Sequence, residues 1–194
     1  MSIRNNRANA RRYAGVRGIG LVELMAVVAI MAILAAMAFP SYSIMIRNQR
    51  VSTQTNDFLS AFNLARNESI SRSRGVSICA ADTRNGAIPT ACGASTDWGN
   101  GWMVFVDDTV SPTTDPPTAI ALGSVIRTWT ANENNLLVPD SAKFFVRFNP
   151  RGLSNLTSDL TFTLKPASNC SNDQQRTIVI TSLGRSSSSK GACS

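Results

Sequence analysis

The sequence predicts an α+β fold in which one long N-terminal helix is followed by a domain of antiparallel β-sheet. Three observations support this prediction. An almost uninterrupted apolar run covers residues 19–39, and apolar residues then recur at helical spacing as far as residue 70. From Gly75 onwards the spacing changes to the alternation typical of strands. With 194 residues, the chain is long enough for one domain with its own core and an appended helix.

Residues 1–18 form a basic leader. They contain five arginines and no acidic residue, and the rest of the chain holds 14 basic and 12 acidic residues. The net charge of +7 is therefore mainly a property of this segment and does not by itself predict a nucleic-acid partner. Basic residues beside an apolar span indicate its cytoplasmic side. The leader also lacks the apolar centre of an ordinary secretory signal.

The 21 residues of the apolar run, 19–39, would extend about 31 Å as a helix, close to the thickness of a bilayer core. We therefore expect one membrane span, with the leader inside. Glu23 lies about one turn into this span, where an unpaired charge costs a few kcal/mol. Cleavage after Gly18 would create a positive amino group at Ile19, with which Glu23 of a neighbouring subunit could pair. The alternative is a carboxylate tolerated at interfacial depth.

The helical pattern continues beyond Pro40 through Ile44, Val51, Phe58 and Phe62. We expect one helix from about residue 19 to about residue 74, ended by Gly75 and kinked at Pro40, because proline removes a hydrogen bond and crowds the preceding turn. Two helices broken at Pro40 are the alternative. The expected organisation is a leader (1–18), the transmembrane half of the helix (19–46) and an α+β head domain (47–194).

The head should contain six strands and a large apolar core. The expected strands are 75–80, 101–107, 119–129, 143–148, 160–165 and 176–182, joined by turns, so the sheet should be antiparallel. Residues 108–118 are rich in proline and predict a loop. Trp98 and Trp102 should fill the core or the space between helix and sheet.

All four cysteines, Cys79, Cys92, Cys170 and Cys193, follow the apolar run, and the chain has no histidine. The spacing lacks a zinc-knuckle pattern, so no metal is expected. Export to the periplasm would favour disulfides. Of the three pairings, Cys79 with Cys92 and Cys170 with Cys193 closes the shortest loops and is favoured; the alternative leaves some thiols free.

The sequence also argues against an enzyme. It lacks a histidine, a nucleophile and base at suggestive spacing, and a glycine-rich loop between strand and helix, so neither catalysis nor a cofactor is expected. Asp107 and Asp108 are interpreted as the solvated start of a turn.

The segment Arg17-Gly18-Ile19-Gly20-Leu21-Val22-Glu23-Leu24-Met25 resembles the class III signal of type IV prepilins and type II secretion pseudopilins. The resemblance implies a pilin fold, cleavage between Gly18 and Ile19 by a prepilin peptidase, N-methylation of Ile19 and an assembly role for Glu23. Pro40 matches the proline that kinks pilin helices. Ile19 and Gly20 replace the usual phenylalanine and threonine of this signal.

The head resembles the GspH/FimT family, including its FimU-like members. The resemblance is carried by 98–105, by Asn149-Pro150-Arg151-Gly152, by Leu183-Gly184-Arg185 and by the helix end 65–70 with 74–76. It implies a minor pilin that helps to initiate a type IV pilus as part of the tip complex, or a minor pseudopilin of type II secretion. The expected partners are other pilins or pseudopilins. The expected location is the inner membrane, with a periplasmic head, and then the assembled filament.

Some FimT members bind DNA through a C-terminal Gly-Arg-x-Arg motif. Here Arg185 is present, Ser187 replaces the second arginine, and the next cation is Lys190. Residues 184–191 would form a flexible loop that contacts phosphate. Two cations predict weak, salt-dependent binding, so DNA is the least favoured partner.

Overall fold

The computed structural model describes residues 20–107 and 120–193, without the side chains of 37–41. The chain divides into two compact units, Met1–Tyr42 and Ser43–Ser194, and each is described by itself. The expected leader, the cleavage site between Gly18 and Ile19 and the methylation of Ile19 lie outside the described residues. The whole of the expected loop 108–118 does so too.

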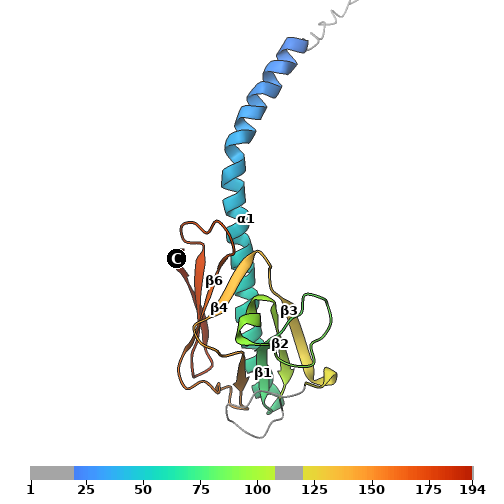
Figure 1. Cartoon of the computed structure of the whole chain (residues 1–194), viewed down its shortest axis with the longest axis vertical. Coiled ribbons are helices and arrows are strands. Elements are labelled where there is room, and N and C mark those ends of the chain that lie inside the picture. The colour runs from blue at the N-terminus through green and yellow to red at the C-terminus, as the bar shows by residue number, and fades with distance from the viewer. Residues whose placement is uncertain (1–19, 108–119, 194) are drawn as a thin grey trace, which may run out of the picture. The chain divides into compact units, whose positions relative to one another are not determined.

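Helix α1 runs from Leu21 to Arg72, which confirms the predicted long helix (Figure 1). It is one helix of 52 residues and includes residue 40, so the alternative of two helices is wrong. A kink at Pro40 stays a prediction, because that side chain lies outside the described residues. Within the described residues, the structure has no helix that is both long and apolar enough to cross a membrane.

The C-terminal end of α1 differs from the prediction in the residue that terminates it. Ser73 adopts a left-handed conformation with φ 51°, and its N–H donates to Ile70 O at 3.2 Å. The N–H of Arg74 donates to Ser69 O at 3.2 Å, which completes a Schellman motif. Gly75 instead lies against the carbonyl of Asp107, where a Cβ atom would collide. The glycine is thus required by close packing of two chain segments rather than by the helix end.

In the part of the chain that the structure describes, eight strands form two antiparallel sheets, which confirms the predicted class of sheet. The first sheet has the order β3-β2-β1-β5 and consists of β1 (Val76–Ala80), β2 (Gly101–Val106), β3 (Val125–Thr130) and β5 (Phe145–Phe148). The second has the order β4-β6-β7-β8 and consists of β4 (Asn135–Pro139), β6 (Leu160–Pro166), β7 (Gln175–Ile180) and β8 (Ser186–Gly191). Two short 3-10 helices, η1 (Ser95–Gly99) and η2 (Leu122–Ser124), lie in the connections.

Three differences concern the strands. The predicted strand 119–129 begins only at Val125, because η2 precedes it. Strand β4 was not predicted, since Pro139 and a short apolar run gave no clear alternation. Strand β8 was not predicted either, because four consecutive serines have low strand propensity.

The main core joins the C-terminal half of α1 to both sheets through Phe58. Its ring lies 4.9 Å from Trp102 of β2, 5.6 Å from Trp98 of η1 and 4.8 Å from Phe162 of β6, each in an edge-to-face arrangement. Trp98 and Trp102 are fully buried, as predicted. Helix residues 43–72 and the two sheets therefore share one core.

The other face of the first sheet covers a smaller core. It contains Met103, Phe105 and Phe145 and the disulfide between Cys79 and Cys92. The second disulfide joins Cys170 to Cys193, so both disulfides close the shortest available loops.

A buried ion pair lies on the same side of the first sheet. Asp107 is 5% exposed, and its Oδ2 accepts hydrogen bonds from Arg147 Nε and Ser77 Oγ, each at 2.7 Å. The interpretation of Asp107 as a solvated turn residue is therefore wrong. The buried charge is stabilised by the guanidinium from β5 and the hydroxyl from β1.

Candidate assembly surfaces

The N-terminal part of α1 exposes apolar side chains on every side. Leu21, Val22, Leu24 and Met25 are 58–80% exposed, and so, at 55–64%, are Val27, Val28, Ile30, Met31, Ile33 and Leu34. A helix that is apolar all round is stable only when other apolar material covers it, either lipid or neighbouring helices. This segment therefore has the chemistry of an element that packs inside a membrane or a helical bundle.

Glu23 is the only charged residue between Leu21 and Ile46. It lies in the first turn of α1, where its N–H donates to Gly20 O at 3.0 Å. Its carboxylate forms no salt bridge with any of the described residues of the chain. A charge at this place suits a cation supplied from outside the chain.

A second surface lies at the C-terminal end of α1. Here the segments 149–152 and 183–185 meet. Gly152 has φ +74°, and a Cβ atom there would lie 2.8 Å from Ile70 Cδ1 of the helix. Gly184 has φ +76°, and its Cβ atom would lie 2.6 Å from Gly152 O. Both glycines are therefore required by positive φ and by close contact. The structure brings together segments that are 32 residues apart in the chain.

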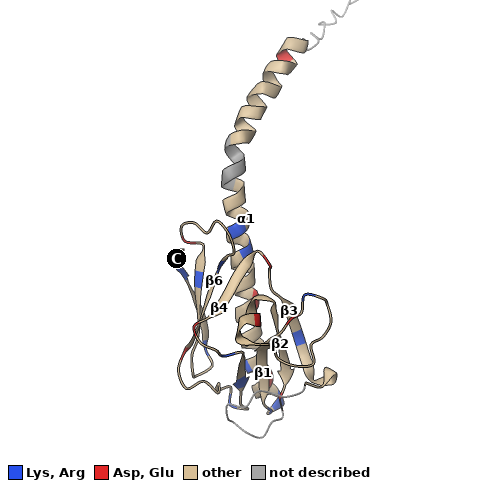
Figure 2. Cartoon of the chain, viewed as in Figure 1, with Lys and Arg blue, Asp and Glu red and all other residues tan. Residues whose placement is uncertain are grey.

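This distal surface is apolar and basic. It consists of the exposed side chains of Ile70, Leu153 and Leu183 with those of Arg151 and Arg185. Arg66 lies beside Gly152, and its buried Nε has no partner among the described residues. Figure 2 shows lysine and arginine positions in blue beside β1, at this end of the head. Such a surface suits a partner that offers apolar groups and carboxylates.

A third surface is a groove of about 880 Å³ between η1 and β4. Leu136 and Val138 alternate along β4 with the buried Leu137 and are 44% and 45% exposed. Glu133 and Asp140 lie at the two ends of this strand and also line the groove. The groove therefore combines apolar side chains with acidic ends.

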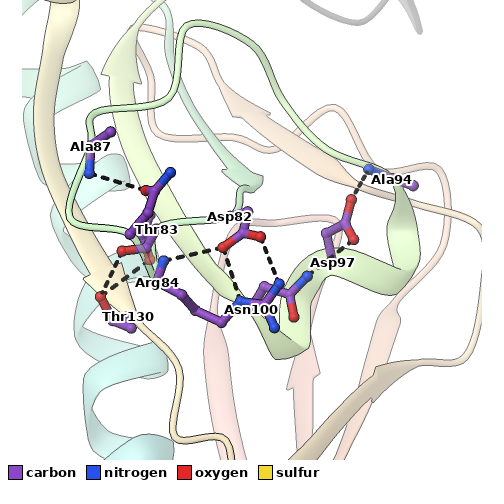
Figure 3. A network of polar contacts seen from close by, with 9 residues as sticks. Asp82, Thr83, Arg84, Ala87, Ala94, Asp97, Asn100 and Thr130 are labelled. Carbon is purple, nitrogen blue, oxygen red and sulfur yellow. Dashed lines mark hydrogen bonds and ion pairs between the residues drawn. The ribbon is translucent and has the colours of Figure 1, made fainter.

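Arg84 lines the same groove, but Asp82 holds its guanidinium. Arg84 Nε donates to Asp82 Oδ1 at 3.0 Å and Nη2 donates to Oδ2 at 2.6 Å, as Figure 3 shows. The hydrogen bonds from Arg84 lower the pKa of Asp82 to about 2. They raise the pKa of Arg84, and the charges of Glu133 and Asp97 act in the same direction.

Asp97 fixes the short helix at the edge of the groove. Its Oδ2 accepts the Ala94 N–H at 2.7 Å, and its Oδ1 accepts Asn100 Nδ2 at 3.2 Å (Figure 3). These hydrogen bonds tie together residues 94–100, which precede β2 and form one side of the groove.

The residues considered for DNA contact lie at opposite ends of one strand. Arg185 precedes β8 and Lys190 lies near its end, so the extended strand separates their Cα atoms by about 16 Å. The prediction of a flexible loop is wrong, because Ser186–Gly191 pairs with β7. Lys190 is instead in register with Arg176, and Arg185 belongs to the distal surface. Sequence reasoning missed this separation because it did not find β8.

A long helix joined through one aromatic core to two antiparallel sheets defines a pilin-like fold. The family model of the type II transport protein GspH matches residues 54–184, and the chain belongs to that family. This is a family of structural subunits, which agrees with the expectation that the protein is not an enzyme. A comparison with curated proteins gave no significant match.

Two crystal structures of the type IV minor pilin FimU from Pseudomonas aeruginosa are similar to this chain. The first is 19% identical, with a TM-score of 0.55, and the match covers 75% of this chain and 96% of that one. The second, in another space group, is 17% identical, with a TM-score of 0.52 and coverage of 74% and 99%. At this identity the likeness shows the fold, a long N-terminal helix packed on antiparallel sheets.

Proposed function

We propose that the protein is a minor subunit that helps to initiate a type IV pilus, at the tip of the filament. The observation that carries this proposal is the N-terminal part of α1, which exposes apolar side chains on every side and holds one carboxylate, Glu23. Such a helix needs apolar neighbours, and a bundle of like helices provides them. The fold shared with a type IV minor pilin favours the pilus.

The resemblance of residues 17–25 to the prepilin signal implies the order of events. Before assembly, the apolar run lies in the inner membrane, and the head is periplasmic, where its disulfides persist. A prepilin peptidase cleaves between Gly18 and Ile19 and methylates Ile19. Glu23 then pairs with the N-terminal amine of a neighbouring subunit, which sets the axial position of the two helices.

The alternative is a minor pseudopilin of type II secretion, which the family model favours. Both assemblies would use the helix and Glu23 in the same way. The partners distinguish them, because pilins would accompany the chain in one case and pseudopilins in the other. DNA binding is not favoured, because Arg185 and Lys190 lie at opposite ends of β8.

The experiment compares Glu23→Gln with the wild-type chain in cells. We expect normal cleavage and membrane insertion but a reduction of roughly tenfold in the amount recovered in sheared filaments, since a lost charge pair of about 1.4 kcal/mol corresponds to that factor. Val27→Ala, on the same exposed helix, is the matched control and should assemble normally. Equal recovery of Glu23→Gln and wild type would refute the pairing role.

A further inference from the structure

We propose that the open edge of β8 binds an extended, acidic segment of a different filament subunit, which adds a strand to the second sheet. The segment would pair with the backbone of Ser186, Ser188 and Lys190. The inference rests on the proposed function in one respect, since the partner is sought among the subunits with which this chain assembles.

Strand β8 is the last strand of its sheet, and among the described residues it pairs with β7 alone. The β7–β8 turn fixes which of its backbone groups β7 uses. The N–H of Thr181 donates to Arg185 O at 2.8 Å, so these two residues form a hydrogen-bonded pair. Such pairs alternate along an antiparallel ladder, and the next ones use Ser187, Ser189 and Gly191. The backbone groups of the intervening residues therefore face away from the sheet.

The residues with outward-facing backbone are Ser186, Ser188 and Lys190. Their N–H and C=O groups have no hydrogen-bond partner among the described residues. An edge of this kind can receive another strand, and proteins commonly protect such edges with proline, a bulge or charged side chains. β8 has no proline, pairs with β7 without a bulge, and holds its one charge near its end. The edge is therefore open to a further strand.

Strand β8 is held in its extended form by contacts at both ends. At its start, Ser186 Oγ donates to Asn63 Oδ1 of α1 at 3.3 Å. Beyond its end, Cys193 forms the disulfide with Cys170, and its N–H donates to Asn172 O at 3.2 Å. Four consecutive serines have low strand propensity, so these restraints help to keep the strand extended. An edge that is already ordered loses little conformational entropy when it binds.

The charges beside β8 favour an acidic partner. Lys190 is in register with Arg176 of β7, so two cations lie side by side on one face of the sheet. Neither forms a salt bridge with a described residue. Arg185, just before the strand, is exposed and also has no salt bridge to a described residue. A strand with a carboxylate beside Lys190 would offset the repulsion between these cations.

A second copy of β8 does not offer this chemistry, because the strand contains no acidic residue. In an antiparallel pair centred on Ser188, Lys190 of each copy would lie opposite Ser186 and close to Arg185 of the other. Cations of both copies would then approach one another. The charges therefore favour a different chain, as expected for a minor subunit whose neighbours in the filament are unlike itself.

The test places a photo-cross-linking amino acid at Ser189 of the full-length tagged chain, in cells that assemble filaments. Ser189 is exposed, so the new side chain can reach a strand bound beside β8. Mass spectrometry then identifies the cross-linked segment. We expect a segment with Asp or Glu from a different pilin or pseudopilin subunit. The same amino acid at Leu122, which is exposed on η2, is the position control and should not capture that segment.

A proline substitution tests pairing through the backbone. Ser188→Pro removes an outward N–H and leaves the hydrogen bonds to β7 in place. It should lower the cross-linking yield roughly tenfold, because one hydrogen bond is lost and the ring obstructs the incoming strand. Ser188→Ala keeps the N–H and is the matched control, with the yield of wild type. Lys190→Glu changes an exposed side chain only, and it should also lower the yield roughly tenfold, because it opposes the partner's carboxylate.

Thermal unfolding shows whether Ser188→Pro folds as wild type does, and if it does not, Lys190→Glu decides. Equal yields from a folded Ser188→Pro and Ser188→Ala, or an unchanged yield from Lys190→Glu, overturn the contact. Capture of a second copy, or of a segment without an acidic residue, overturns it too. Filaments that contain the chain without this cross-link overturn the contact and leave the proposed function standing. The expected cross-link between chains that never enter filaments would support the contact and refute the proposed function.

Discussion

Replacing Phe58 by alanine should detach α1 from both sheets more severely than any other single change in the helix. Phe58 is fully buried, and its ring contacts Phe62, Trp98, Trp102 and Phe162 edge-to-face. Truncation of a buried phenylalanine costs about 3–5 kcal/mol, because the transfer free energy and the contacts around the cavity are both lost. We expect a value near the upper end, since each edge-to-face pair contributes about 0.5–1.5 kcal/mol beyond burial.

The assay is urea unfolding of the full-length chain in detergent, followed by the fluorescence of its three tryptophans, Trp98, Trp102 and Trp129. With a loss of about 5 kcal/mol and a slope of about 2 kcal/mol/M, the midpoint should fall by roughly 2.5 M. Leu183→Ala is the control, and its exposed side chain should change stability by less than about 0.5 kcal/mol. A Phe58→Ala midpoint within 0.3 M, or about 0.6 kcal/mol, of wild type would refute the shared aromatic core.

Three further predictions concern the glycines, the ion pair and the cleavage site. Gly184→Ala should cost about 2–3 kcal/mol, because φ is +76° and the new Cβ would lie 2.6 Å from Gly152 O; thermal unfolding measures this, and an effect no larger than that of Gly123→Ala, which has open space around it, would contradict it. NMR titration should give Asp82 a pKa of about 2, and Arg84→Gln should return it towards 3.8; because the folded value is depressed, the contribution to stability is present above pH 3.8 and lost as the pH falls towards 2, and equal pKa values in both proteins would exclude the pair in solution. Gly18→Ala should leave the precursor uncleaved, and a mature N terminus at Ile19 detected by mass spectrometry in that variant would refute the cleavage assignment.

Features with a local signal were predictable from the sequence. Helical spacing gave the extent of α1 to within two residues at each end, and alternation located β1, β2, β5, β6 and β7. The burial of Trp98 and Trp102 followed from their size and apolar character. Glu23 was conspicuous because it interrupts an apolar run, which is a property of the sequence alone.

Features that depend on distant contacts could not be predicted in this way. Gly75 and Gly184 carry no local sign of the carbonyl groups that approach them from Asp107 and Gly152. Strand β8 forms because β7 supplies its hydrogen bonds, although its serines favour no strand on their own. The burial of Asp107 likewise depends on Arg147, 40 residues later. The groove beside β4 was missed because the strand itself was missed.

The central claim is that this chain works by assembly with other filament subunits. The most direct test is to cross-link intact cells, purify the tagged full-length chain and identify the proteins bound to it by mass spectrometry. The account predicts pilin or pseudopilin subunits in the wild-type sample and their loss from the Glu23→Gln sample. Recovery of the wild-type chain without any such subunit would contradict it.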